Sequence, residues 1–252
     1  MRLLKKLFTI GLCITIFFIS SYSGFADDTW HLHDNEPEMS DDEEIELGKR
    51  VDEYIKKRFH LCTDTELNKR VNNITQKLVL LSDRKTLPYT CTIIESFSVN
   101  AFSAPGGYIY LTYGLLEFAE NEDELAGIIG HEIAHASLKH VARLYHDVIE
   151  IFSHKDNGTS TDGNLILHTH LKEFEQEADS LGVFYACRAG FNPDGLPDFL
   201  ERHLNFMSHH GALSILNFGF FVTVNTRINL LREYILTLKK EEKKEEIYES
   251  ND

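Results

Sequence analysis

The chain has 252 residues, of which 25 are Lys or Arg and 40 are Asp or Glu, so its formal net charge is −15 at pH 7. That acidity excludes a protein that binds nucleic acid through its phosphates, because such binding needs a basic surface. The length suits one domain with a substantial hydrophobic core, and the sequence contains no internal repeat and no Gly/Ser-rich linker.

Residues 1–26 have the pattern of a secretory signal peptide. Arg2, Lys5 and Lys6 form a basic start, and residues 7–19 form an apolar run. We expect cleavage after Ala26. The alternative, a retained anchor, is disfavoured because the run is shorter than the roughly 20 apolar residues that span a bilayer. The sequence therefore predicts an exported protein, periplasmic or secreted, with no transmembrane span after signal cleavage.

Residues 27–39 form an acidic leader with little to bury, and we expect folding to begin at Ser40. Ser40 with Glu43, and Thr63 with Glu66, predict capping boxes that open two helices. Both helices carry apolar residues at helical spacing, which are Leu47, Val51, Ile55 and Phe59 in the first and Leu67, Val71, Ile74, Leu78 and Leu81 in the second. We place one folded domain at residues 40–236 and a charged tail or frayed helix at residues 237–252.

The next segment predicts short strands around a turn. Residues 89–94 alternate as in a strand, and Pro105-Gly106-Gly107 forms a turn before a β-rich run at residues 108–112. One interpretation is an ordinary hairpin. The other is a strand whose free edge pairs with an extended peptide. On that second interpretation, the candidate substrate-binding residues are Asn100, Ala101, Gly106, Gly107 and Tyr108.

A capped apolar helix follows, opened by Asn121 with Glu124 three residues further on. It carries the sequence His-Glu-Ile-Ala-His, which places His131 and His135 on one face of the helix, one turn apart. Two neutral imidazoles in that arrangement can bind Zn²⁺, and Glu132 can lie beside the open coordination position. The alternative is a chance match with partly buried histidines. It is disfavoured because small residues around the motif allow close backbone approach.

A catalytic zinc site usually has three protein ligands and leaves its fourth position to water. The third histidine of metzincins is excluded, because Leu138 stands in the place of its glycine and Val141 in the place of its histidine. His140 is one residue away from that position. We therefore expect His140 to support a ligand from behind or to pack in the core.

A later helix offers four carboxylates within one stretch, at residues 173, 175, 177 and 179. Glu175 and Asp179 share a face with two small residues beside an apolar stripe, whereas Glu173 and Glu177 point further out and are expected to be solvated. Glu175 is thus the best candidate for the third ligand. Asp179, one turn away, can accept a hydrogen bond from a ligand histidine and fix its tautomer. The other three carboxylates stay open as alternatives to Glu175.

Four motifs in order carry a resemblance to a known family, and they are Asn-Ala-Phe-Ser-Ala-Pro-Gly-Gly-Tyr-Ile, His-Glu-Ile-Ala-His, Glu-Gln-Glu-Ala-Asp-Ser-Leu-Gly and Ala-Gly-Phe-Asn-Pro-Asp-Gly. The chain resembles the gluzincin zinc metallopeptidases related to the CAAX prenyl endopeptidases, and most of all their soluble exported branch. The resemblance implies an α+β fold, predominantly helical and of the zincin type, with a small β-sheet bordering the active-site cleft. It implies His131, His135 and Glu175 as ligands of one Zn²⁺ per chain, Glu132 as the catalytic acid/base and Asp179 as support for a ligand.

Two features depart from that family's pattern. Lys172 stands where members often have Arg, and residues 223–228 read Thr-Val-Asn-Thr-Arg-Ile instead of Thr-His-Pro followed by an Arg-Ile pair. The histidine that can cover the metal in relatives is therefore absent. His203, His209 and His210 are candidates to replace it, and surface positions for all three are the alternative.

The sequence thus predicts an exported zinc metalloendopeptidase in which Glu132 takes a proton from the attacking water and passes it to the leaving amine. The expected substrates are polypeptides, in particular misfolded or envelope proteins in quality control. The resemblance adds the outer-membrane assembly machinery as a candidate partner. The alternative is a non-catalytic, chaperone-like binding protein with a metal-stabilised cleft. In an oxidising compartment Cys62 and Cys91 could form a disulfide.

Overall fold

A computed structural model describes residues 39–144, 160–209 and 218–249 of the chain. The predicted signal peptide, nearly all of the predicted leader and His210 lie outside these residues. In chain order, the elements are α2 (Asp41–Arg58), α3 (Thr65–Val79), β1 (Thr90–Ile94), β2 (Ala101–Ala104), the 3₁₀ turn η2 (Pro105–Gly107), β3 (Tyr108–Thr112), α4 (Tyr113–Phe118), α5 (Glu122–Ser137), α7 (Ser160–Arg188), α8 (Gly195–His209) and α9 (Phe218–Glu249). Within these segments, no helix combines the length and apolar character needed to cross a membrane.

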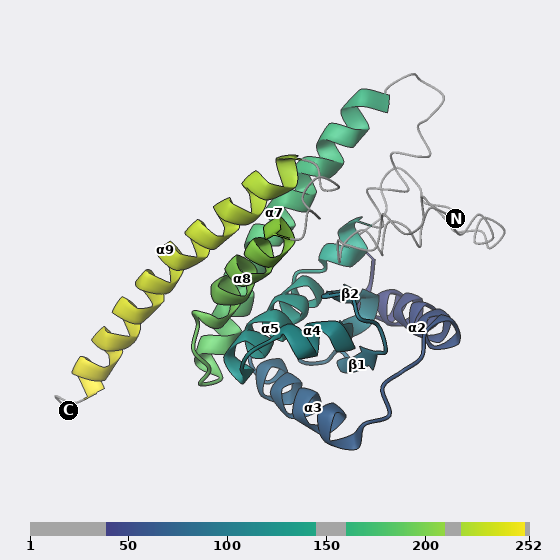
Figure 1. The fold of residues 1–252 in the computed structure, drawn as a ribbon, viewed down its shortest axis with the longest axis horizontal. Coiled ribbons are helices and arrows are strands. Elements are labelled where there is room, and N and C mark those ends of the chain that lie inside the picture. The colour runs from purple at the N-terminus through teal and green to yellow at the C-terminus, as the bar shows by residue number, and fades with distance from the viewer. Residues whose placement is uncertain (1–38, 145–159, 210–217, 250–252) are drawn as a thin grey trace.

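Helix α5 lies between two groups of elements (Figure 1). On one side it contacts α7 and α8, which in turn contact α9; on the other it contacts α3, β2 and the η2 turn. Its apolar residues, among them Ile129 and Ile133 with no exposed surface, join the main core with residues from α3 and the sheet. The predicted fold class is confirmed, since the described chain is predominantly helical with one small sheet.

The sheet has three strands in the order β1-β3-β2. Strand β3 pairs in parallel with β1 and antiparallel with β2, with Ala101 opposite Leu111 and Ala104 opposite Tyr108. The prediction that residues 108–112 offer a free edge is therefore wrong, because both edges of β3 are already paired. The free edge on this side of the sheet belongs to β2.

The N-terminal helix α2 begins as predicted, since Ser40 and Glu43 form a complete capping box. Of the predicted apolar stripe, Ile55 is buried, and Val51 and Phe59 pack against the same core cluster. The buried face also includes Glu44, Gly48 and Asp52, which the stripe did not predict. Two of these are charged and each has a partner: Glu44 pairs with Arg84, and Asp52 accepts a hydrogen bond of 2.9 Å from the Tyr110 hydroxyl. The helix thus packs on the sheet through polar contacts as well as apolar ones.

Helix α3 begins one residue later than the predicted Thr63 cap. Asp64 is the N-cap, and its carboxylate accepts hydrogen bonds from the backbone N–H groups of Glu66 and Leu67. Asp and Thr are both good caps, and local sequence does not decide between neighbours. The predicted inward stripe holds for Val71, Ile74 and Leu78, which are all buried.

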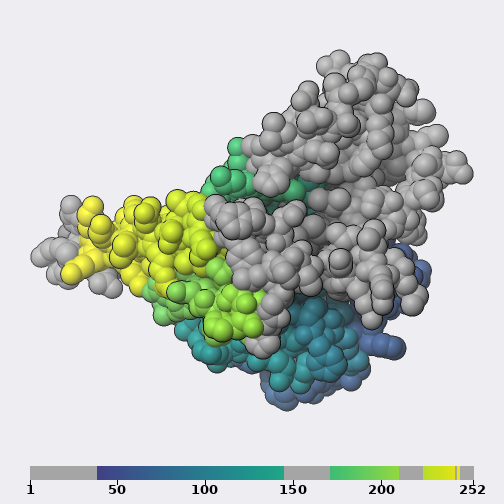
Figure 2. Space-filling view, turned by 45° about the horizontal axis from the view of Figure 1, so that its top comes forward, coloured from purple at the N-terminus to yellow at the C-terminus, as the bar shows by residue number. Residues whose placement is uncertain are grey.

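The predicted charged tail is a continuation of α9, which runs to Glu249. Leu238 is the last buried residue of the helix among those whose burial is described, and the charged residues after it are exposed. Figure 2 shows this end of α9, in yellow, projecting from the body of the molecule. Cys62, Cys91 and Cys187 are free cysteines, so the possible disulfide between Cys62 and Cys91 is not formed in this structure.

Candidate metal centre

The His-Glu-Ile-Ala-His motif lies on α5, and two side chains fix the first turn of this helix. Asn121 caps the helix by accepting a hydrogen bond from the Glu124 N–H at 2.9 Å. The Glu124 carboxylate accepts from the N–H of Glu120, one residue before the predicted partner, and also pairs with Arg202 of α8. The predicted capping box is therefore half formed, because the carboxylate that would close it ties α8 to the start of α5 instead.

Two glycines bring α5 and α7 into close contact at the level of the motif. A Cβ atom on Gly182 would lie 2.5 Å from the backbone nitrogen of His131, and one on Gly130 would lie 2.6 Å from the carbonyl oxygen of Gly182. No side chain fits at either position. Because the two backbones touch here, the two turns of α7 before Gly182, which contain Glu175 and Asp179, lie next to His131 and His135.

Three side chains from these helices converge, as the sequence predicted. The Nε2 atoms of His131 and His135 lie 3.0 Å apart. Glu175 places Oε2 3.7 Å from Nε2 of His131 and Oε1 3.4 Å from Nε2 of His135. All donor atoms lie within 4.8 Å of one another. The histidines are buried and Glu175 is half-buried, so the group is largely shielded from water.

Asp179 and Arg227 lie behind this group. Oδ1 of Asp179 is 2.9 Å from Nδ1 of His131, the contact that was predicted to fix the tautomer of that ring. The guanidinium of Arg227 on α9 binds both carboxylates, with Nε 2.7 Å from Asp179 Oδ2 and Nη1 2.6 Å from Glu175 Oε2. Helix α9 therefore contributes a buried positive charge to a site built from α5 and α7.

The charges in the site set the pKa values of its carboxyl groups. Burial alone would raise the pKa of Glu175, but Arg227 and the neighbouring imidazoles outweigh burial and hold that pKa well below its usual range. The pKa of Asp179 is likewise lowered, because Arg227 and His131 overcome the effect of burial. Both groups are consequently anionic at neutral pH, the state in which a carboxylate can bind a cation.

His140 lies on the opposite side of His135. Its Nδ1 is 3.1 Å from Nδ1 of His135, and its Nε2 is 2.9 Å from Oε2 of Glu177. The ring is fully buried and stacks on Phe174 with centroids 4.3 Å apart. Burial, together with the neighbouring His135, lowers the pKa of His140 to about 2. His140 was predicted either to pack in the core or to lie behind a ligand histidine. It does both, because it stacks on Phe174 and contacts His135.

The hydrogen-bond pattern tests whether these residues fit a metal ion. Ionised carboxylates only accept hydrogen bonds, so Glu177 requires a proton on Nε2 of His140. Within the described residues, Nδ1 of His131 forms no hydrogen bond, but the negative charge of Asp179 at 2.9 Å favours a proton on that nitrogen. The unprotonated Nδ1 of His140 then requires a proton on Nδ1 of His135. Both Nε2 atoms are left as lone pairs that face each other at 3.0 Å, next to the Glu175 carboxylate. Three electron-pair donors in such a cluster fit a divalent cation, and His₂Glu is a known zinc ligand set.

The predicted substrate-binding residues divide into two groups. Gly106 and Gly107 are buried beneath other elements: a Cβ on Gly106 would lie 2.8 Å from the Cα of Ile45 in α2, and one on Gly107 would lie 3.2 Å from the Tyr89 ring. Their positive φ angles of 75° and 86° shape the turn, which is the reason for glycine there. Both glycines thus serve the packing of the turn, and their contact with a substrate stays a prediction.

Asn100, Ala101 and Tyr108 remain as candidates for substrate contact. Ala101 begins the edge strand β2 and is partly exposed, as is Tyr108 on the neighbouring strand. The backbone of Asn100 is fixed by Thr112, whose hydroxyl oxygen accepts from the Asn100 N–H at 3.0 Å. Asn100 is buried, and among the described residues none forms a hydrogen bond with its side-chain amide, so its contact with a substrate stays a prediction.

The candidate replacements for the missing histidine lie elsewhere. His203 packs against Phe118 and Phe199 with ring centroids 5.6 and 5.9 Å away. The ring of His209 contacts the carbonyl of Asn205, one turn before it on α8. Within the described residues, the donor cluster of the metal centre contains neither of them. Lys172 is exposed.

Sequence reasoning did not assign a role to Arg227 or to Glu177. The signal for Arg227 was its place in the Arg-Ile pair after the variant Thr-Val-Asn-Thr segment, but nothing local joins it to Asp179, 48 residues earlier. Glu177 was expected to be solvated, and its side chain is indeed 53% exposed. One of its oxygens nevertheless contacts the buried His140, which helical periodicity cannot reveal.

The fold and the donor set together define a metallopeptidase domain of the His-Glu-x-x-His class. The chain belongs to peptidase family M48, whose sequence profile matches residues 65–233. The predicted family resemblance is therefore confirmed.

The chain is similar to bacterial beta-barrel assembly-enhancing proteases and to mitochondrial metalloendopeptidases. The beta-barrel assembly-enhancing protease of Escherichia coli (strain K12) is 26% identical over 188 residues, which are 66% of this chain and 39% of that protein. The protein of the same name from Yersinia pestis is 25% identical over 185 residues, or 65% of this chain and 38% of that protein. The mitochondrial metalloendopeptidase OMA1 of Saccharomyces cerevisiae is 27% identical over 165 residues, or 62% of this chain and 47% of that protein. The chain thus spans less than half the length of these relatives.

Proposed function

We propose that this protein is a zinc-dependent endopeptidase whose metal ligands are His131, His135 and Glu175. The observation that carries the proposal is the cluster of two histidine nitrogens and one carboxylate within 4.8 Å, with electron pairs that face a common point. Beside it, the described residues offer the Glu132 carboxylate no hydrogen bond or ion pair. A structural zinc site is usually closed by four protein ligands and needs no such base. The combination favours catalysis.

The side chains of the site have distinct tasks in this proposal. Bound zinc supplies a Lewis acid that polarises the scissile carbonyl and acidifies the attacking water. Glu132 takes the proton of that water and delivers it to the nitrogen of the leaving amine. Asp179 orients the ring of His131, and Arg227 holds Glu175 and Asp179 in place through its two ion pairs.

The substrate class that we propose is an extended polypeptide. Edge strand β2 has one side unpaired within the sheet, and it contacts α5, the helix that carries the motif. A peptide in extended conformation can add to such an edge through main-chain hydrogen bonds. In this arrangement the Asn100 amide and the partly exposed Ala101 and Tyr108 would contact the peptide next to the metal.

We further propose export and a role in quality control of misfolded or envelope proteins. The signal-like pattern of residues 1–26 supports export. The names of the bacterial relatives support the outer-membrane assembly machinery as a candidate partner. The mitochondrial name of the yeast relative shows that the family works in more than one compartment, so cell fractionation is needed to locate this chain.

The decisive experiment compares the wild-type protein with Glu132→Gln. We expect the wild type to cleave unfolded casein and to lose this activity with a chelator. The variant should keep one zinc ion per chain but cleave at least about 100-fold more slowly, since general-base catalysis is worth roughly 10² to 10⁴ in rate. A variant that still cleaves at the wild-type rate would refute the role of Glu132. Zinc-dependent binding of casein without cleavage by the wild type would favour the chaperone-like alternative.

A further inference from the structure

A chain of polar contacts leads from the metal centre to the protein surface. It runs from His135 through the buried His140 to Glu177, with contacts of 3.1 Å between the two Nδ1 atoms and 2.9 Å between Nε2 and the carboxylate. The other histidine, His131, has a carboxylate directly behind it, Asp179 at 2.9 Å. Each histidine of the motif is therefore backed by a carboxylate, one directly and one through an intervening imidazole.

The direction of this chain is set at its outer end. A carboxylate offers no proton, so Glu177 places the proton of His140 on Nε2. Nδ1 of His140 then accepts, and Nδ1 of His135 donates. Because a neutral imidazole carries one proton, Nε2 of His135 is left with its lone pair directed at the cluster. Without a fixed acceptor at the outer end, the chain can reverse, and Nε2 of His135 would then carry a proton that blocks a metal ion.

We infer that Glu177 is a positioning residue that acts through His140 to keep Nε2 of His135 ready for the metal. The inference rests on the proposed ligand set and extends it by two residues that do not touch the ion. Carboxylates behind metal-binding histidines commonly act in this way, and their loss weakens metal binding by about 10- to 100-fold. In this protein the carboxylate, Glu177, is on the surface, and it acts on His135 through a buried histidine, His140.

The exposure of Glu177 makes the inference testable without damage to the core. Its side chain is 53% exposed, so Glu177→Gln keeps the size of the side chain and removes no buried contact other than the one to His140. A glutamine amide can donate as well as accept, so it no longer imposes a direction on the chain. Glu173→Gln is the matched control, because it removes the same charge from an exposed position one turn earlier on α7.

The experiment measures the zinc dissociation constant by competition with a chromophoric chelator, in the full chain. We expect Glu177→Gln to raise this constant about 10- to 100-fold, with Glu173→Gln close to the wild type. The melting temperature of the metal-free Glu177→Gln protein should equal that of the metal-free wild type. Equal zinc affinity in Glu177→Gln and the wild type would overturn the inference, as would equal losses in both glutamine variants, which would indicate a general effect of charge.

A second variant tests whether Glu177 acts through His140. In His140→Phe the ring can still stack on Phe174 but makes no hydrogen bonds, so adding Glu177→Gln should not weaken zinc binding further. An additional loss of the same size in the double variant would overturn the route through His140. If the wild type itself binds no zinc, the proposed function fails, which is a different result from normal binding in all variants.

Discussion

Arg227 lowers the pKa values of Glu175 and Asp179 more than any other neighbouring group does. It lies on α9, far along the chain from the two histidines. Its buried guanidinium lies 2.6 Å from Glu175 and 2.7 Å from Asp179. Without it, two neighbouring carboxylates would be buried with only imidazoles for partners. Removal of one member of a buried ion pair is costly because the remaining charge is left unpaired. Arg227 therefore has a structural task even before any metal binds.

We predict that Arg227→Met destabilises the metal-free protein. At pH 7 we expect the free energy of unfolding to fall by about 3–5 kcal/mol. In the wild type, both carboxyl pKa values are lowered on folding from ordinary values of 4.5 and 3.8. The stabilisation is thus complete above about pH 5 and is lost as the pH falls through the lower pKa values of the folded state.

Urea unfolding in the presence of a chelator, from pH 7 to pH 3, provides the measurement. The difference between the wild type and Arg227→Met should shrink as the pH falls below about 4.5, because the two carboxyl groups then bind protons in the unfolded chain while the folded wild type still holds them ionised. A difference that stays constant over this range would show that Arg227 stabilises the fold by packing alone.

At the scale of elements, the contact between α5 and α7 determines where Glu175 lies. Gly130 and Gly182 allow the two backbones to touch at the level of His131. The carboxylate is two turns of α7 away from Gly182, so a shift of that helix moves it relative to both histidines. The ligand geometry proposed above thus depends on two positions that carry no functional group.

We predict that Gly182→Ala weakens both the fold and zinc binding. The added methyl group would lie 2.5 Å from the backbone nitrogen of His131, and a backbone atom cannot move aside as a flexible side chain can. Overpacking of this kind costs roughly 1–3 kcal/mol. Thermal unfolding and zinc titration provide the measurements.

Ser180→Ala is the control for this prediction, since it changes a half-buried residue of the same helix whose hydroxyl only bonds within α7. It should leave zinc affinity unchanged. Wild-type affinity in Gly182→Ala would mean that α7 can shift without displacing Glu175.

The elements also show why some features were predictable from sequence. The caps at Ser40 and Asn121 depend on residues within one turn, and both side chains bond as expected. The spacing of His131 and His135 depends only on helical geometry. The position of Glu175 next to both histidines was predicted from the amphipathic face of α7 together with family motifs. The role of Glu175 as a metal ligand remains a prediction.

Features that depend on pairing between distant segments were missed. The central place of β3 follows from its parallel pairing with β1, which no local pattern specifies. The buried face of α2 differs from its apolar stripe because Arg84 and the Gly106 turn provide partners for Glu44. The same applies to Arg227, whose partners lie on another helix.

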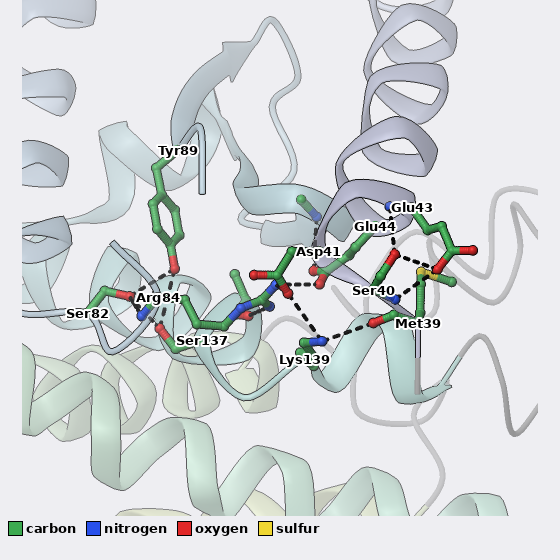
Figure 3. A network of polar contacts seen from close by, with 12 residues as sticks. Met39, Ser40, Asp41, Glu43, Glu44, Ser82, Arg84, Tyr89, Ser137 and Lys139 are labelled. Atoms are coloured by element: carbon green, nitrogen blue, oxygen red, sulfur yellow. Dashed lines mark hydrogen bonds and ion pairs between the residues drawn. The ribbon is translucent and has the colours of Figure 1, made fainter. Parts of the chain in front are cut away.

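At the scale of the whole molecule, a polar network joins α2 to the end of α5 and to the turn that precedes β3, and Figure 3 shows Glu44 of α2 next to Arg84 in this network. Arg84 donates to the carbonyl of Ala136 at the end of α5 at 2.8 Å and to Glu44 at 2.8 Å. The other oxygen of Glu44 accepts from the Gly106 N–H at 3.1 Å. Gly48 strengthens the contact, because a Cβ there would lie 2.1 Å from the Pro105 carbonyl oxygen. The buried Glu44 carboxylate thus joins α2 directly to the turn before β3 and, through Arg84, to the end of α5.

We predict that Glu44→Ala loosens this connection. Arg84 would keep only Asp41 as an anionic partner, and the Gly106 N–H would lose its acceptor. The expected loss is on the order of 3–5 kcal/mol in the free energy of unfolding. In the proposed reaction KM should also rise, because the turn at Gly106 connects β2 to β3. Urea unfolding and peptide cleavage provide the two measurements.

Glu46→Ala is the matched control for that prediction. Within the part of the chain that the structure describes, its exposed carboxylate pairs only with Lys49 and Arg50 at 3.6 and 3.8 Å on the same helix. Such surface pairs contribute about 0–1 kcal/mol. If both variants lost equal stability, the buried network would have no special importance.

The spread of the centre along the chain has a consequence for biosynthesis. Its polar side chains begin with His131 on α5 and end with Arg227 on α9, so the final contributor is translated long after the histidines. A nascent polypeptide that lacks α9 holds two carboxylates without their cation. The ion pairs that hold Glu175 and Asp179 in place therefore form only after α9 has left the ribosome and packed against α7.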